Sequence, residues 1–217
     1  MCRTPRFRAA ALLLASLLGS CQSPPVPLPA GAGLLAADLE APSGAELFER
    51  PVWTPGDWYD FRRGGRIRLR YLVQDGPAGA ELLDPDSGRT LAFDADLSQL
   101  GERPAATDAW SVQLDPLDPT FSWPLWPGKR WSGSFTRRGA DGVELPLIVH
   151  YECDAIEEIR VPAGTFRALR IWRRSSPALE GEFIDRVSIA WYAPEVGYLV
   201  QRVDEGIKTQ LEGFHRQ

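Results

Sequence analysis

Apolar and polar side chains alternate with a period of two along most of the chain after residue 51, and this alternation limits the fold more than any other feature. In RIRLRYLVQ (66–74), the apolar face consists of Ile67, Leu69, Tyr71 and Val73. Such a period is typical of strands that bury one face of an antiparallel sheet. No segment after residue 51 keeps a period of 3.6 over twelve residues. The sequence therefore predicts a mostly β protein.

The alternation recurs, and short turn segments separate its repeats. Further strands are expected in RTLAFDADL (89–97), in WSVQLD (110–115) and in a long strand pair within residues 143–172. The turn segments, rich in Asp and Gly, are DGPAG (75–79), DPDSG (84–88) and RGADG (138–142). Glycine there supplies the positive φ that tight turns need. We expect a strongly curved antiparallel sheet, half-barrel or barrel-like, with few short helices.

The first twenty residues have the pattern of an export signal. MCRTPRFR carries three arginines and no acid, and AAALLLASLLGS is an apolar run that ends in small residues. The run is shorter than the roughly 20 apolar residues of a membrane-spanning helix. A basic start, an apolar middle and small residues at the end are the marks of a leader that is removed after export.

Leu18-Gly19-Ser20-Cys21 follows that leader and resembles the lipobox of bacterial lipoproteins. The resemblance implies cleavage between Ser20 and Cys21, diacylation of the Cys21 thiol and acylation of the new amino terminus. Two or more acyl chains give stable anchoring, at about 0.8 kcal/mol per buried methylene. Gln22 stands where an aspartate would imply retention in the inner membrane, so the resemblance implies an outer-membrane lipoprotein facing the periplasm in a Gram-negative cell. The alternatives are an ordinary secretory signal with a chance cysteine, or a misassigned start.

Three regions are expected along the chain. Residues 1–20 form the lipoprotein signal peptide, 21–46 the lipidated cysteine and a flexible Pro/Ala/Gly-rich tether, and 47–217 a single β-rich domain. Ser43 and Glu46 have capping-box spacing, which predicts about two turns of helix in SGAELFER (43–50).

Charge and cysteine content exclude some classes of protein. Without the leader the chain has 21 basic and 29 acidic side chains, a net charge of −8, and no basic run. We therefore expect no nucleic-acid partner. Cys2 is lost with the leader and Cys21 is lipidated, so Cys153 is left alone and no disulfide can form within the mature chain.

No combination of residues predicts catalysis, a metal or a cofactor. His150, Glu152 and Asp154 share the polar face of one expected strand, where neighbours on a face lie about 6–7 Å apart, so a solvated face explains them best. Cys153 falls on the apolar face, away from His150, and reads as a small buried apolar residue. The chain lacks G-x-S-x-G, H-E-x-x-H and a phosphate-binding glycine loop. A carboxylate pair assembled across strands stays open, but we expect that the protein is not an enzyme.

VPAGTF (161–166) and WYAPEVGYL (191–199) together resemble motifs of periplasmic families of unknown function. The likeness covers about residues 120–213. It implies a curved antiparallel sheet similar in style to the half-barrel of the lipoprotein carriers LolA and LolB, and no catalytic residues. The residues alone predict turns at both places, with Trp191 and Tyr198 packed together across the second turn.

Eight tryptophans are many for a domain of this size. They fill the core of a curved sheet, or some of them line a ligand cavity. The segment FSWPLWPGKRW (121–131) interrupts the alternation, so its tryptophans are the candidate ligand-binding residues: Trp123, Trp126 and Trp131. Our first hypothesis is a membrane-anchored carrier for a hydrophobic ligand, a lipid or acyl chain. The alternative is a non-catalytic accessory lipoprotein that binds an envelope protein complex.

Overall fold

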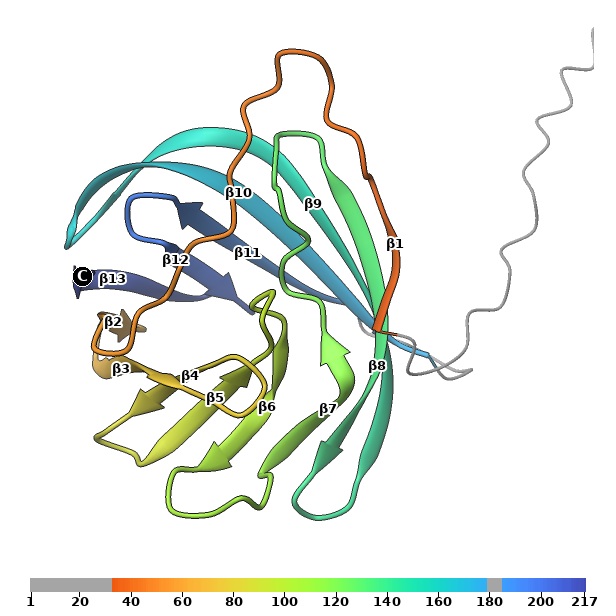
Figure 1. Ribbon diagram of the computed structural model, residues 1–217, viewed down its shortest axis with the longest axis vertical. Helices are drawn as coiled ribbons and strands as arrows, with labels where there is room; N and C mark the ends of the chain where they lie inside the picture. Colours follow the sequence, from red (N-terminus) through yellow and green to blue (C-terminus); the bar gives the residue numbers. More distant parts are fainter. Residues whose placement is uncertain (1–32, 179–184) are drawn as a thin grey trace, which may run out of the picture.

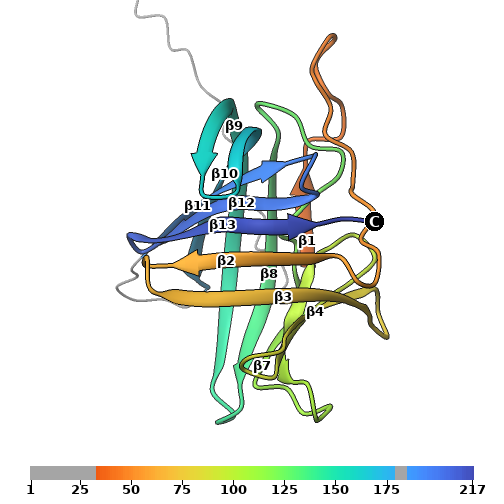
Figure 2. The same ribbon diagram turned by 90° about the vertical axis from the view of Figure 1, so that its left-hand side faces the viewer.

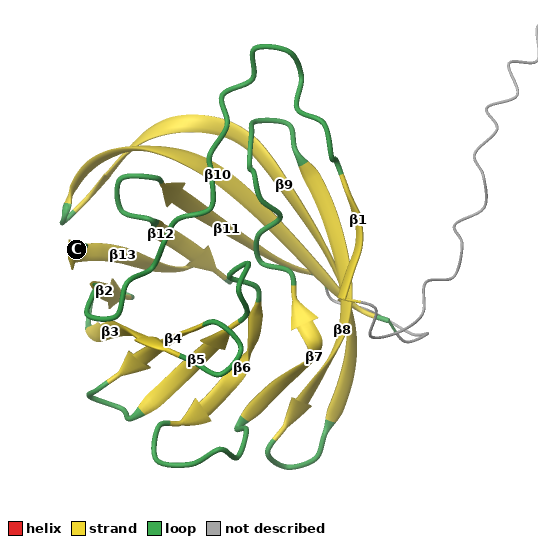
Figure 3. Cartoon of the chain, viewed as in Figure 1, coloured by secondary structure: helices red, strands yellow, loops and turns green. Residues whose placement is uncertain are grey.

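Thirteen β-strands and their connecting loops make up the residues that the computed structural model describes, 33–178 and 185–217 (Figure 1). The strands are β1 (Gly33–Ala37), β2 (Trp58–Arg63), β3 (Ile67–Asp75), β4 (Ala80–Asp84), β5 (Arg89–Phe93), β6 (Gln99–Pro104), β7 (Val112–Asp118), β8 (Arg130–Gly139), β9 (Glu144–Val161), β10 (Gly164–Pro177), β11 (Arg186–Ala193), β12 (Tyr198–Asp204) and β13 (Ile207–His215). These residues contain no helix (Figure 3), so the expectation of a few short helices was wrong. No helix among them is long and apolar enough to cross a membrane.

The strands β2 to β13 form a closed antiparallel barrel. Each strand pairs with the next one along the chain, and β13 pairs with β2 to close the ring of twelve. The expected mostly β, barrel-like fold is thus confirmed. In Figure 2 the strands β2, β3 and β13 run nearly at right angles to β8 behind them, which shows how strongly the sheet coils.

Strand β1 is not one of the twelve strands of the ring. It pairs with a part of β8 that β7 does not reach. It pairs antiparallel with the first half of β8, from Gly33 opposite Ser134 to Ala37 opposite Trp131, while β7 pairs with the second half of β8. Part of the stretch expected to be a tether, 21–46, is therefore a strand of the sheet. The leader and Cys21 lie outside the described residues.

The observed burial follows the predicted alternation in the middle of the strands, but Ile67, expected on the apolar face, is exposed at the start of β3. In β3 the side chains of Tyr71 and Val73 are buried, and in β9 those of Val149, Tyr151 and Cys153 are buried. The predicted turns also lie between strands, at residues 76–79, 85–88 and 140–143. Inward-facing residues of neighbouring strands meet in two connected groups of aromatic and aliphatic side chains that fill most of the barrel.

An up-and-down order puts the connecting loops alternately at the two ends of the barrel. At one end, residues 38–57 and 119–129 cross the opening (Figure 1), and we call this the covered end. At the other end are the described connections 64–66, 85–88, 105–111, 140–143 and 205–206, and we call this the open end.

The helix predicted over residues 43–50 is absent: residues 42–45 form a turn, with Ala45 N–H donating to Pro42 O at 3.0 Å, and the chain then returns across the covered end without helix. Phe48 and Leu125 form an isolated β-bridge through both backbone hydrogen bonds, Phe48 N–H to Leu125 O at 2.8 Å and Leu125 N–H to Phe48 O at 2.9 Å. The Phe48 side chain is buried between the two segments. A two-turn helix is marginal on its own, so this tertiary pairing decides the local structure.

WYAPEVG joins β11 to β12 by a tight turn, as predicted, but its aromatic residues pack differently. A bulge between Trp191 and Tyr192 changes the alternation, and Tyr192 enters the core. Tyr198 packs against Trp53, Tyr59 and Phe61, whereas the Trp191 indole donates to Glu157. The expected contact between Trp191 and Tyr198 was therefore wrong.

Candidate functional site

Two adjoining cavities lie inside the barrel, with volumes of about 250 Å³ and 240 Å³. Six residues line both of them: Leu91, Gln99, Glu102, Tyr198, Leu199 and Arg202. We call the pair the barrel cavity.

The inner part of the barrel cavity has a wall that is partly apolar. Its buried lining includes Leu114, Phe121, Phe135 and Leu199. Strands β5, β7, β8 and β12 contribute apolar side chains to this wall, so it comes from several sides of the ring.

A buried polar cluster interrupts that wall. The Tyr151 hydroxyl donates to Asp118 Oδ1 at 2.5 Å, Arg173 Nη2 donates to Asp118 Oδ2 at 2.9 Å, and Arg173 Nε donates to Tyr151 Oη at 3.0 Å. Burial raises the pKa of the Tyr151 hydroxyl, so it stays protonated and donates its proton to the Asp118 carboxylate. Each member of the cluster therefore has a partner, and the carboxylate and guanidinium neutralise each other.

Arginines dominate the part of the barrel cavity near the open end. Arg63, Arg137 and Arg202 line the cavity and are also exposed, so the cavity reaches solvent among them. Arg89 is partly buried beside them, and its Nε is a buried donor with no partner among the described residues.

The three tryptophans predicted to bind a ligand lie at the covered end and belong to the core. Trp123 stacks on Phe121 with ring centroids 4.9 Å apart, and its indole donates to Asp96 O. Trp126 is 2% exposed, with Lys129 Nζ 4.2 Å from its ring centroid. Trp131, 3% exposed, stacks on Tyr151 at 4.9 Å. None of these three lines the barrel cavity.

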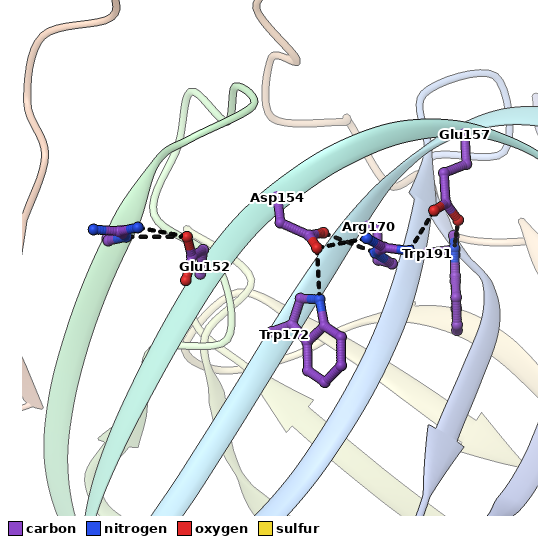
Figure 4. Close-up of polar contacts among 7 residues, drawn as sticks. Glu152, Asp154, Glu157, Arg170, Trp172 and Trp191 are labelled. Atoms are coloured by element: carbon purple, nitrogen blue, oxygen red, sulfur yellow. Dashed lines mark hydrogen bonds and ion pairs between the residues drawn. The ribbon is translucent and has the colours of Figure 1, made fainter.

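A second hollow, of about 670 Å³, lies on the outside of the sheet along β1, β8, β9 and β10. The polar residues predicted on β9 are on this face, where arginines engage the acidic ones (Figure 4). Glu152 pairs with Arg130 at 2.7 Å, and Asp154 pairs with Arg170 at 2.6 Å. The Arg170 hydrogen bond lowers the pKa of the Asp154 carboxyl. Exposed His150 lines the same hollow.

Because arginines pair with Glu152 and Asp154, these two carboxylates are already engaged on the outer face. No group of three His, Cys, Asp or Glu side chains suited to a metal occurs in residues 33–178 and 185–217. Cys153, in the same strand, points inward and is fully buried. Burial raises the pKa of its thiol to about 12, which suppresses the reactive thiolate. Cys21, the predicted lipidation site, lies outside the described residues.

Sequence reasoning missed the arginines of the barrel cavity, although the sequence carries a signal for them. Arg63 follows Tyr59 and Phe61 in the inward phase of β2, and Arg137 follows Phe135 in that of β8. Arg173 likewise continues the phase of Leu169 and Ile171. An arginine that keeps the apolar phase near a strand end indicates a charge that faces the barrel interior.

Comparisons with known proteins give structural likeness only. No protein-family model and no curated protein matches the chain. The hypothetical lipoprotein YmcC from Escherichia coli K12 is 11% identical, with a TM-score of 0.46, over 76% of this chain and 89% of that one.

Two further solved structures resemble the chain to a similar degree. A provisionally assigned exported protein with a YmcC-like fold from Bacteroides fragilis has 17% identity and a TM-score of 0.44, over 78% of this chain and 100% of that one. A provisionally assigned lipoprotein from Parabacteroides distasonis has 14% identity and a TM-score of 0.44, with the same coverage. Likeness at this level does not carry over a function.

Proposed function

We propose that the protein is a bacterial envelope lipoprotein, anchored through acylated Cys21, whose barrel cavity binds a hydrophobic ligand such as a lipid or an acyl chain. The observation that carries this proposal is a cavity inside a closed barrel, with apolar side chains in its inner wall, that reaches solvent among arginines at one end. Ligand pockets usually measure about 300–1,000 Å³. Each of the two cavities is slightly smaller than that, but together they fall within the range.

The position of the chain entry supports the proposal. Strand β1 runs antiparallel to β8, so the chain enters β1 from the side of the open end. Eleven residues lie between Cys21 and Gly33, and the twelve Cα–Cα steps span at most about 40 Å when extended. The anchor would thus keep the open end within reach of the membrane surface, where an acyl-chain ligand would be found. We place the anchored protein at the outer membrane, facing the periplasm, in a Gram-negative cell.

A second candidate function is a non-catalytic accessory role beside an envelope protein complex. It is favoured by the filling of most of the interior, since Tyr59, Phe135 and Tyr192 are at most 1% exposed. It is also favoured by the crossing segments at the covered end. Under this role the remaining cavity would be a packing defect.

Extraction from native membranes tests the binding function. Protein purified in mild detergent and analysed by native mass spectrometry should carry a lipid-sized ligand, which denaturation would release. Leu91 lines both cavities and is only half-buried, so Leu91→Trp should fill the space and abolish the co-purified mass. An unchanged melting temperature would show that the variant folds. Ligand-free wild-type protein, or equal ligand on the variant, would contradict binding in the barrel cavity and favour the accessory role.

A further inference from the structure

We infer that the barrel cavity selects an anionic amphiphile, with a carboxylate or phosphate paired to Arg63 or Arg137 at the open end and an alkyl chain along the apolar part of the interior. The inference rests on the proposed binding function and adds to it the charge and orientation of the ligand.

The wall of the cavity carries more positive than negative side chains. Its charged lining consists of five arginines and three carboxylates: Arg63, Arg89, Arg137, Arg173, Arg202, Glu102, Asp118 and Asp204. The whole chain, by contrast, has 24 basic and 29 acidic side chains. The cavity is therefore positive inside an acidic protein, and a concentration of one sign of charge in a low-dielectric recess attracts the opposite charge.

Three of the five arginines that line the cavity form ion pairs with its three carboxylates. Each carboxylate has one arginine of its own: Glu102 pairs with Arg89 at 3.2 Å, Asp118 with Arg173 at 2.9 Å, and Asp204 with Arg202 at 2.6 Å. No carboxylate within the described ranges lies within 4.0 Å of Arg63 or Arg137, so the excess charge belongs to these two. The buried Nε of Arg89 adds an unused donor in the same cavity.

Arg63 and Arg137 lie at the solvent end of the cavity and apolar groups lie deeper in. Arg63 is exposed at the end of β2, and Phe61 and Leu69, which line the cavity deeper in, are buried or half-buried. Arg137 stands in the same relation to Phe135 on β8. A ligand with one charged end and one apolar end would meet both kinds of wall together. Arginine forms strong, often paired hydrogen bonds to carboxylate and phosphate oxygens, which suits it to the charged end.

The test uses three photoreactive probes that share one sixteen-carbon chain with a diazirine and differ in their end group: a carboxylate, a phosphate monoester and a neutral alcohol. The full mature lipoprotein is reconstituted in phosphatidylcholine nanodiscs, illuminated with each probe, and mapped by peptide mass spectrometry. We expect the two anionic probes to label cavity peptides about tenfold more than the alcohol, which corresponds to about 1.4 kcal/mol. Labelling by one anion only would identify the end group.

Matched variants assign the effect to the two arginines. The double variant Arg63→Gln, Arg137→Gln should lower anionic labelling about tenfold and leave alcohol labelling unchanged, at an unchanged melting temperature. Arg160→Gln is the control, because Arg160 is an exposed β9 arginine outside the cavity that also has no carboxylate within 4.0 Å in the described part of the chain. Equal labelling by alcohol and anions would overturn the inference while the binding function stands. No probe in the cavity would overturn the binding function itself.

Discussion

Gly197 is a single residue on which the turn between β11 and β12 depends. Its φ is 69°, and a Cβ added there would lie 2.7 Å from Arg216 Cζ. Arg216 in turn donates to Val52 O at 3.0 Å and holds the C-terminal end against the covered end. We predict that Gly197→Val lowers the free energy of unfolding by more than about 1 kcal/mol, measured by urea denaturation.

Gly142→Val is the matched control for that substitution. Gly142 has a similar φ of 77°, but no atom lies within 4 Å of an added Cβ. Both variants carry the cost of positive φ, so the additional loss at Gly197 measures the displacement of Arg216. Equal losses would show that Arg216 simply moves aside, and no loss at Gly197 would contradict the turn assignment.

The Cys153 thiol gives a second prediction at the scale of one residue. It is fully buried, and burial raises its pKa to about 12, so at pH 8 it remains protonated. We predict that iodoacetamide at pH 8 leaves Cys153 unmodified in the folded protein and modifies it in 8 M urea, as measured by intact mass. Rapid modification under native conditions would mean that the thiol is reachable and has a catalytic or redox role to explain.

At the scale of strands, the alternation of side chains predicted most of what the structure shows. The inner faces of β3 and β9 follow from their apolar phase, and the turns follow from their Asp and Gly residues. What failed depended on contacts between distant segments. The 43–50 segment pairs with Leu125 instead of forming a helix, and a bulge, which a simple period does not contain, turned Trp191 away from Tyr198. The tryptophans of 121–131 were predicted to bind the ligand but lie at the covered end, while the cavity is lined by arginines that the predicted site did not include.

The cluster of Asp118, Tyr151 and Arg173 joins β7, β9 and β10, and its members should contribute unequally. Asp118→Ala leaves the guanidinium without its carboxylate and the hydroxyl without its acceptor, and should cost about 3 kcal/mol. Tyr151→Phe removes a hydroxyl but keeps the ion pair, and should cost about 1 kcal/mol. Chemical denaturation measures both.

Asp108→Ala is the comparison for the Asp118 substitution. Asp108 is fully exposed and reaches Arg103 only at 3.7 Å, so its loss should leave the free energy of unfolding nearly unchanged. A similar effect of Asp108→Ala and Asp118→Ala would show that the buried cluster adds nothing to stability beyond a surface charge.

For the whole molecule, the sequence predicted a curved sheet but could not decide between a half-barrel and a closed ring. Closure depends on the pairing of β13 with β2, which are about 150 residues apart in the chain, for example Leu211 opposite Phe61. Alternation within each strand says which face is buried but not which strand lies beside it. Closure also removes free sheet edges, and it creates an interior that contains a cavity as well as a core.

Cys21 gives the prediction for the whole molecule. If its thiol carries the acyl chains, Cys21→Ala removes the hydrophobic anchor and leaves an acidic barrel with no other predicted hold on the membrane. We expect the variant either to leave the membrane fraction or to remain unprocessed with its leader attached. Fractionation and the intact mass of wild-type and variant protein distinguish these results.

Cys153→Ala controls for the loss of a thiol, because Cys153 is buried in the barrel and should not affect localisation. Membrane retention of Cys21→Ala at the mature wild-type mass would refute lipidation at this residue. The binding function would then lack its membrane anchor, since the reach of the open end to the membrane depends on the eleven residues between Cys21 and Gly33. The anchor and the cavity are thus separable by experiment, although the proposed function needs both.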